Sequence, residues 1–170
     1  MKETPQQYIE RILGYLDGKK PLDLLSASPR KIAAPVKGVT KAKLSKRPQP
    51  DTWSITEILA HLADVEIVQG VRIRMILGSS GTPLQGFDQD VWAGYSNYAK
   101  HDPSLSLQAY VTNRERTVRL LKSLSADMWN RFGMHSERGK ETVTRVAEMM
   151  AGHDINHMRQ IRAILKGTRA

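Results

Sequence analysis

The stretch that decides the fold lies near the end of the chain, at residues 152–161, and reads GHDINHMRQI. From residue 142 onward, apolar side chains recur at the three- and four-residue spacing that is typical of one helix face. The members of this face are Val143, Val146, Met150, Ile161 and Ile164. His153 and His157 occupy positions where the same face calls for core residues. The sequence therefore predicts a final helix over residues 141–166 with two imidazoles on its buried side.

The two histidines stand four residues apart, which on an α-helix gives about 40° of rotation and about 6 Å of rise. Both rings can therefore reach one point above the helix face. A third histidine, His61, lies between Ile58 and Val65 on the apolar face of another predicted helix. Three imidazoles on two helices, with one coordination position left open, form the arrangement that a catalytic divalent metal needs. Nitrogen ligands suit zinc, nickel, iron or copper, and the spacing does not choose among them.

These histidines also have other interpretations. With five histidines in 170 residues, a pair four apart can arise by chance, and a single histidine on an apolar face is usually a hydrogen-bonded core residue. A structural pair therefore stays open, although burying imidazole nitrogens without partners costs about 1–3 kcal/mol each. His153, Asp154 and His157 resemble the zincin motif with Asp in place of Glu, but no third ligand follows downstream. That absence argues against a protease.

Several polar residues lie close to the histidines in the sequence. Asp154, Asn156 and Gln160 are either partners that orient the imidazole rings or exposed helix residues. Asp64 and Glu66 have the same ambiguity beside the third histidine, where each is a site residue or a surface or helix-pairing residue. The sequence assigns none of them a catalytic role.

Two helices are predicted in the first part of the chain. Thr4 and Pro5 provide a cap and a first-turn proline for a short amphipathic helix that ends at Gly18. Residues 22–36 form a second helical piece, which we expect to be interrupted around Pro29.

The middle of the chain supplies two more helices. Ser54 and Glu57 form a Ser-x-x-Glu capping box, which predicts a helix that runs to about residue 77. Residues 103–126 form another amphipathic helix. Its basic residues are expected to lie mostly outside, and they are Arg114, Arg116, Arg119 and Lys122. Residues 129–140 are predicted to be a turn region.

Strand-like alternation is nearly absent, so the predicted fold class is all-α. Four principal helices and one long crossover, at residues 78–102, indicate a four-helix bundle, in which cofactor sites are built from facing helices. The crossover carries three aromatic residues that either wall a substrate pocket or pack against the bundle. They are Phe87, Trp92 and Tyr95.

Composition limits the function classes. A chain of 170 residues can bury a self-sufficient core, so we expect one domain over residues 1–170. The net charge of +9 suits an anionic partner, and basic residues gather without any acid in residues 24–50. That stretch also holds prolines and a glycine, which is typical of a solvated connection. No nucleic-acid-binding motif accompanies the charge, which argues against nucleic acid as the partner.

The chain contains no cysteine. This excludes disulfides, thiolate ligands and a cysteine nucleophile, and it is compatible with a reducing compartment. The first 13 residues are charged and amphipathic, unlike a signal peptide, and no apolar run approaches the roughly 20 residues of a membrane span. We therefore expect a cytoplasmic protein that does not enter the membrane.

Four motifs, taken together, resemble those of one known family. They are WSITEILAHLADVE at residues 53–66, FDQDVW at 87–92, GKETV at 139–143 and HDINHMRQI at 153–161. Their order and spacing are similar to those of the DinB-like superfamily of metalloenzymes, over about residues 21–165. Each motif alone is modest evidence, and the combination is fairly specific.

The resemblance implies an up-down-down-up four-helix bundle, usually a homodimer, with a divalent transition metal such as zinc, nickel, iron or manganese. Carried over residue by residue, the implied metal ligands are His61, His153 and His157. Related enzymes include S-transferases that use low-molecular-weight thiols such as bacillithiol, and a mycothiol-dependent isomerase. The implied partners are therefore a small-molecule substrate, including such a thiol, and a second copy of the chain.

We therefore expect a divalent-metal-dependent enzyme that activates a low-molecular-weight thiol or water for S-transfer or hydrolysis. Two alternatives from other classes stay open. One is a non-catalytic metal-binding or metal-sensing module whose basic segment contacts a partner. The other is a structural helical bundle whose histidines are neutral core residues.

Overall fold

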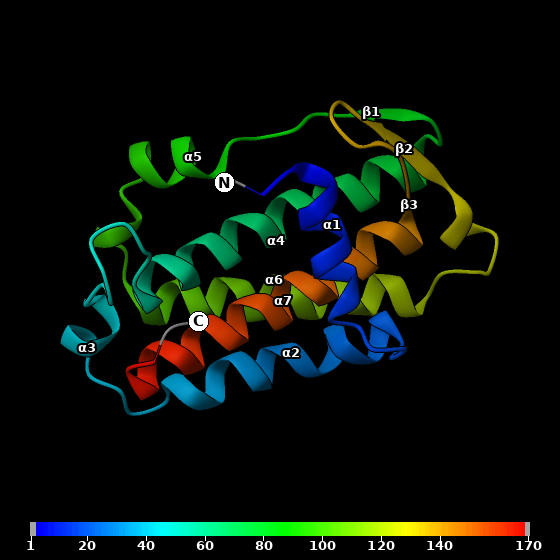
Figure 1. The fold of residues 1–170 in the computed structure, drawn as a ribbon. Coiled ribbons are helices and arrows are strands. Elements are labelled where there is room, and N and C mark those ends of the chain that lie inside the picture. Colours follow the sequence, from blue (N-terminus) through cyan, green and yellow to red (C-terminus); the bar gives the residue numbers. More distant parts are fainter. Residues whose placement is uncertain (1–2, 169–170) are drawn as a thin grey trace.

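Four long helices form the centre of the computed structural model, which describes residues 3–168 apart from the side chain of residue 5 (Figure 1). They are α2 (Pro21–Val36), α4 (Ile55–Gly78), α6 (Pro103–Lys122) and α7 (Val143–Lys166). α2 and α7 run in one direction along the bundle, and α4 and α6 run in the other. α2 and α4 each pack against both α6 and α7. The predicted up-down-down-up four-helix bundle is therefore confirmed.

Because α4 and α6 are parallel neighbours, the chain must return along the bundle between them. The returning segment contains strand β1 (Thr82–Leu84), helix α5 (Gln89–Tyr95) and the short 3₁₀ helix η1 (Tyr98–Lys100). Two further short helices lie outside the bundle: α1 (Pro5–Gly14) and α3 (Lys41–Ser45). α3 lies within the basic stretch that was expected to be only a solvated connection.

A small sheet closes one end of the bundle, where the sequence predicted only turns (Figure 1). After the 3₁₀ helix η2 (Met128–Asn130), strands β2 (Phe132–His135) and β3 (Gly139–Thr142) pair antiparallel, and β1 pairs parallel to β2. Strands of three or four residues are too short to show alternation in a sequence. Gly133 permits the parallel pairing, because a Cβ there would lie 2.7 Å from Leu84 and 3.0 Å from the Thr82 carbonyl oxygen.

Helix α2 is continuous, so the predicted interruption around Pro29 is wrong. A proline inside a helix leaves the carbonyl four residues earlier without its N–H donor. Here that carbonyl belongs to Leu25, and the Ser28 hydroxyl donates to it at 3.0 Å. The side chain of the preceding residue therefore supplies the hydrogen bond that the proline removes.

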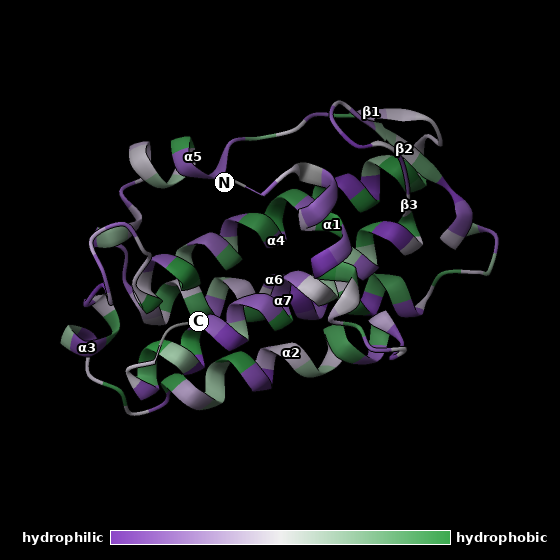
Figure 2. Cartoon of the chain, viewed as in Figure 1, coloured by the Kyte–Doolittle hydropathy of each residue, from purple (hydrophilic) through white to green (hydrophobic). Residues whose placement is uncertain are grey.

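The apolar faces of the bundle form two clusters of buried side chains, and Figure 2 shows hydrophobic and hydrophilic residues mixed along each long helix. One cluster lies toward the sheet and includes Ile73, Leu121 and Met150. The other includes Ile58 and Ile161 at the opposite end. Within residues 3–168, no helix is both long and apolar enough to cross a membrane.

Helix α1 packs across α7 and approaches it very closely at Gly152. A Cβ at Gly152 would lie only 2.2 Å from the backbone carbonyl oxygen of Ile12, a distance that no side chain can tolerate. Gly152 is the residue that precedes the first histidine of α7. Glycine at this position therefore allows α1 to lie over the helix next to that histidine.

Arg114 joins all four bundle helices at a point between the two apolar clusters. It is 2% exposed, so the expectation that it faces outward is wrong. Its guanidinium pairs with Asp154 of α7 and donates from Nε to Glu66 of α4 at 2.8 Å. It also donates to the hydroxyls of Ser28 on α2, at 2.7 Å, and Tyr110 on its own helix, at 3.1 Å. Periodicity marked Arg114 as polar and could not show its buried partners.

Replacing Arg114 by Met should lower the free energy of unfolding by about 3–5 kcal/mol, because two buried carboxylates would lose their cation. Urea unfolding followed by circular dichroism measures this change. Arg116→Met, at an exposed position of the same helix, is the matched control and should change stability by less than about 0.5 kcal/mol. A loss below about 1 kcal/mol for Arg114→Met would show that the buried charges do not depend on this cation.

Candidate metal centre

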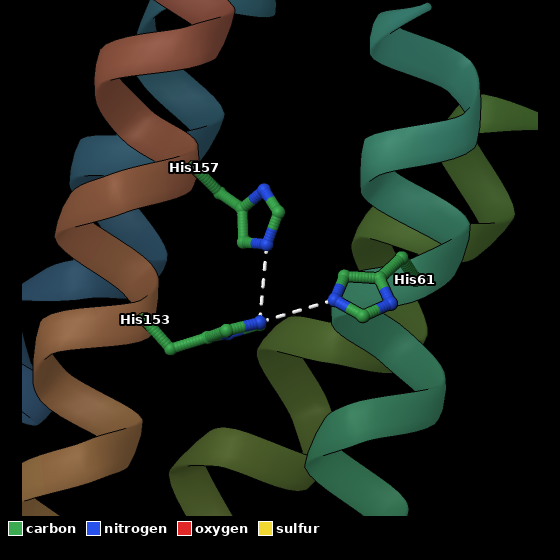
Figure 3. Close-up of side chains that lie close together, drawn as sticks. All are labelled: His61, His153 and His157. Atoms are coloured by element: carbon green, nitrogen blue, oxygen red, sulfur yellow. Dashed lines mark hydrogen bonds between the residues drawn. The ribbon is translucent and has the colours of Figure 1, made fainter. Parts of the chain in front are cut away.

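Helices α4 and α7 lie side by side and direct three histidines toward one another (Figure 3). His61 comes from α4, and His153 and His157 come from consecutive turns of α7. The start of α4 is fixed by the predicted capping box, in which Ser54 accepts from the Glu57 backbone and the Glu57 carboxylate accepts from the Ser54 backbone. His61 follows about two turns later. The structure therefore brings together the three residues that the sequence selected.

The distances between the ring nitrogens are those expected if each of the three imidazoles directs a nitrogen lone pair toward one common point. Nε2 of His153 lies 3.0 Å from Nε2 of His61 and 3.0 Å from Nε2 of His157. A neutral imidazole nitrogen carries either one hydrogen or one lone pair, so the His153 nitrogen can form only one of these two hydrogen bonds. A hydrogen-bonded triad of neutral rings would therefore leave one close contact unexplained.

Burial keeps all three imidazoles neutral near physiological pH. It lowers the pKa of His61 to about 2, with a smaller contribution from His157. It also lowers the pKa of His157 to about 4, against the opposing effect of the hydrogen bond to Gln160. The pKa of His153 is held well below its ordinary value by the same burial. Neutral imidazole is the form that binds a metal, so no proton has to leave these rings first.

Neighbouring side chains orient two of the rings. Nδ1 of His157 lies 2.8 Å from the amide oxygen of Gln160, which fixes the hydrogen on Nδ1 and leaves the lone pair on Nε2. The ring of Trp53 packs against His61 at a centroid distance of 4.9 Å. Nδ1 of His61 is buried without a hydrogen-bond partner among the described residues. Gln160 thus has the orienting position that the sequence left open.

The residues present fit a divalent transition metal. The three rings offer one nitrogen each, and these candidate ligand atoms all lie within 4.8 Å of one another. A tetrahedral zinc with Zn–N bonds of about 2.0–2.1 Å would separate its ligand nitrogens by about 3.3 Å. The two 3.0 Å separations are close to that value. Three imidazole nitrogens suit zinc, nickel, iron or copper better than manganese, which prefers oxygen ligands, and they do not choose among those four metals.

A cavity of about 1510 Å³ reaches the histidines from outside. His153, His157 and Gln160 line its inner part, together with Trp53. The remaining lining comes from α1 and the residue range just before it, from α3 and the segment that follows it, from the starts of α4 and α5, and from α7 and the residues that follow it. A small molecule that enters this cavity can therefore contact two of the three imidazoles.

The other polar residues near the histidines in sequence serve the fold. Asp154 and Glu66 both pair with Arg114, and among the described residues neither forms a hydrogen bond with the three rings. Asn156 accepts a hydrogen bond from Arg11 at 2.9 Å, which connects α7 to α1. The predicted alternative of a helix-pairing role therefore holds for Glu66, and Asp154 is a buried partner rather than an exposed helix residue.

Asp64 supports the wall of the site indirectly. It accepts a hydrogen bond from the hydroxyl of Tyr98 at 2.6 Å. The ring of Tyr98 is 2% exposed and packs edge-on against Trp53, with centroids 6.2 Å apart. Trp53 in turn contacts His61. The interaction fixes η1 beside the start of α4 and supplies no group to the cavity.

The three aromatic residues of the crossover do not line the cavity. Phe87 packs against Trp92 at a centroid distance of 4.7 Å, and Trp92 approaches Tyr95 at 6.5 Å. The same segment contributes Gln89 and Asp90 to the cavity instead. The substrate wall is therefore not seen for any of these rings. Phe87 contacts the bundle through Arg72 of α4, at 5.8 Å from the ring centroid, whereas Tyr95 is 69% exposed.

Sequence reasoning missed the contribution of the basic stretch. Lys43, Lys46 and Arg47 line the cavity, together with Arg11 of α1. The available signal was a run of cations without any acid, which was read as a solvated connection. Only the three-dimensional path of the chain, which returns past α7, shows that these side chains surround the entrance.

The chain belongs to the DinB superfamily, whose family model matches residues 24–161. Its fold is shared with a solved structure of YfiT from Bacillus subtilis, described as a probable metal-dependent hydrolase with an unusual four-helix bundle topology. The TM-score is 0.80 at 19% sequence identity, over 97% of this chain and 89% of that chain. The predicted resemblance is therefore confirmed at the level of family and fold.

Curated relatives cover most of the same length. A protein of Oceanobacillus iheyensis is 23% identical over 134 residues, which are 76% of this chain and 75% of the relative. The Bacillus subtilis protein YfiT is 24% identical over 123 residues, or 72% and 68% of the two chains. Both relatives bear provisional names as metal-dependent hydrolases.

Chelator-treated protein should lose stability as the pH falls from 7 to 5.5. The folded state lowers the pKa of His61 and His157 below the unfolded value of about 6.5, so the unfolded state binds more protons in this range. Each such histidine then costs up to about 1.4 kcal/mol per pH unit below its unfolded pKa. Urea unfolding at each pH measures the slope.

Replacing one histidine of the cluster shows how much of this pH dependence of stability it causes. His157→Gln should make the slope shallower, because it removes one of the rings whose pKa burial lowers. Equal free energies of unfolding at pH 7 and pH 5.5 in the unsubstituted protein would contradict the neutral, buried state of the histidines.

Proposed function

We propose that this chain is a divalent-metal-dependent enzyme that activates a low-molecular-weight thiol or water to attack a small electrophile, by S-transfer or hydrolysis. The observation that carries the proposal is the convergence of three neutral imidazoles, two of which line a cavity. The provisional names of the relatives support metal dependence and favour water as one of the two nucleophiles.

His61, His153 and His157 are the residues that would hold the metal. When bound, a divalent metal lowers the pKa of a coordinated water or thiol and so supplies a nucleophile near neutral pH. The surrounding residues keep the ligands ready. Gln160 holds the hydrogen of His157 on Nδ1, which leaves the lone pair on Nε2, and Trp53 covers the ring of His61 and restricts its rotation.

A thiol nucleophile would have to come from a small molecule, because the chain contains no cysteine. The cavity of about 1510 Å³ exceeds the volume of most single small ligands, so a thiol and an electrophile could bind side by side. Holding two reactants together converts their encounter into an effectively unimolecular step. Hydrolysis would need only the electrophile in the same space.

The test measures turnover with both nucleophiles. Protein purified without a metal-chelating tag would be loaded separately with zinc, nickel, iron and manganese. Thiol consumption would be followed with a panel of alkylating and arylating electrophiles, and hydrolysis with a panel of esters and amides. We expect metal-dependent turnover, with kcat/KM lowered at least about a hundredfold in His153→Gln. This loss exceeds the one caused by removing a residue that only hydrogen-bonds a metal ligand.

His101→Gln provides the matched control, since this histidine hydrogen-bonds the Ser96 carbonyl and lies outside the cluster. It should retain full turnover. Metal-loaded protein that is inert with every thiol, ester and amide would contradict the enzyme proposal. Tight metal binding in that inert protein would favour the non-catalytic metal-binding or metal-sensing module.

A further inference from the structure

The outer part of the cavity is lined by cations from two segments that are far apart in the sequence. Three of them are the rim lysines, Lys43 in α3, Lys46 just after it and Lys166 at the end of α7. α3 and the C-terminal end of α7 lie at the same end of the bundle (Figure 1). The fold therefore gathers charges that the sequence leaves more than a hundred residues apart.

The cavity cations differ in whether the protein neutralises them. Arg47 pairs with the buried carboxylate of Glu57, and Arg11 pairs with Glu3 at 2.8 Å. Within residues 3–168, the rim lysines form no ion pair. All three are exposed, so their long side chains can turn toward a ligand in the cavity.

Three carboxylates also line the cavity, against five cations. Glu3 is already paired with Arg11. Glu57 first, and Asp51 to a smaller extent, raise the pKa of Arg47, which places Asp51 in the field of that guanidinium. Asp90 lies in the first turn of α5, on a different segment from the rim lysines. The excess positive charge of the lining is therefore carried by the rim lysines.

We propose that the substrate of this site carries an anionic group, a carboxylate or a phosphate, that binds the rim lysines while its reacting group lies at the histidines. Ammonium groups bind both kinds of anion, and a cavity with excess positive charge raises the local concentration of anionic ligands. The inference deepens the proposed function and rests on it, since it names the substrate class of the same site.

The first test compares two thiols with the same number of carbon atoms, one ending in a carboxylate and the other in a neutral hydroxyl. Full-length protein loaded with Co²⁺ would be titrated with 6-mercaptohexanoate and with 6-mercaptohexanol, and the thiolate-to-cobalt charge-transfer absorption would report binding. We expect about tenfold tighter binding of the carboxylate at low salt, since each exposed ion pair adds a factor of roughly two to three. The difference should shrink as salt screens the charges.

Two double variants test whether the rim lysines cause the tighter binding of the carboxylate thiol. Lys43→Gln combined with Lys46→Gln should reduce the preference to below about threefold, with cobalt uptake unchanged. Lys20→Gln combined with Lys122→Gln, at exposed positions outside the cavity lining, should leave it unchanged. Equal affinity for the two thiols, or a preference that the rim variant retains, would overturn the proposal.

A second measurement does not depend on the metal. Full-length protein would be treated with pyridoxal phosphate and borohydride, which label lysines near a bound phosphate, and the labelled peptides would be identified by mass spectrometry. We expect the rim lysines to be labelled first. Labelling spread evenly over the exposed lysines would refute the anion site. A failure to bind cobalt would instead refute the metal centre, and the labelling would still decide the anion site.

Discussion

One buried cation holds the two ligand-bearing helices together. Arg114 reaches from α6 to a carboxylate on α4 and to another on α7, and these are the helices that supply the histidines. Glu66 stands five residues after His61, and Asp154 directly follows His153. Arg114 donates to both oxygens of Asp154, a geometry that constrains position and orientation together, and to one oxygen of Glu66. The cluster therefore fixes how α4 faces α7 within about one and a half turns of the imidazoles.

The buried ion pairs of Arg114, which stabilise the bundle, involve different side chains from those that line the cavity. Arg114 binds Glu66 and Asp154, and Asp64 accepts from Tyr98, so the three imidazoles have the amide of Gln160 as a hydrogen-bond partner and no carboxylate among the described residues. Burial lowers the pKa of all three rings and keeps them unprotonated, against a smaller opposing effect of Asp154 on His157. The cations that remain free lie at the outer end of the same cavity. A neutral, metal-competent inner part and a basic entrance together favour a small anionic substrate.

The sequence predicted the features that depend on local patterns. The Ser54 capping box and the shared face of the histidines follow from helical spacing, and the superfamily resemblance supplied the topology. The burial of Arg114 could not be predicted, because its carboxylate partners lie 48 and 40 residues away. The continuity of α2 depends on the Ser28 hydroxyl, and the sheet on strands too short to show a period. The low-molecular-weight thiol and the homodimer stay predictions.

Metal content tests most directly the central claim that three histidines hold a divalent metal. Protein purified without a metal-chelating tag, incubated with zinc, nickel, iron or manganese and then dialysed, would be compared with His157→Ala and His101→Ala by elemental analysis. The account predicts about one metal ion per chain in the unsubstituted protein and in His101→Ala, and almost none in His157→Ala. No metal in any of the three proteins, or equal amounts in all three, would contradict it.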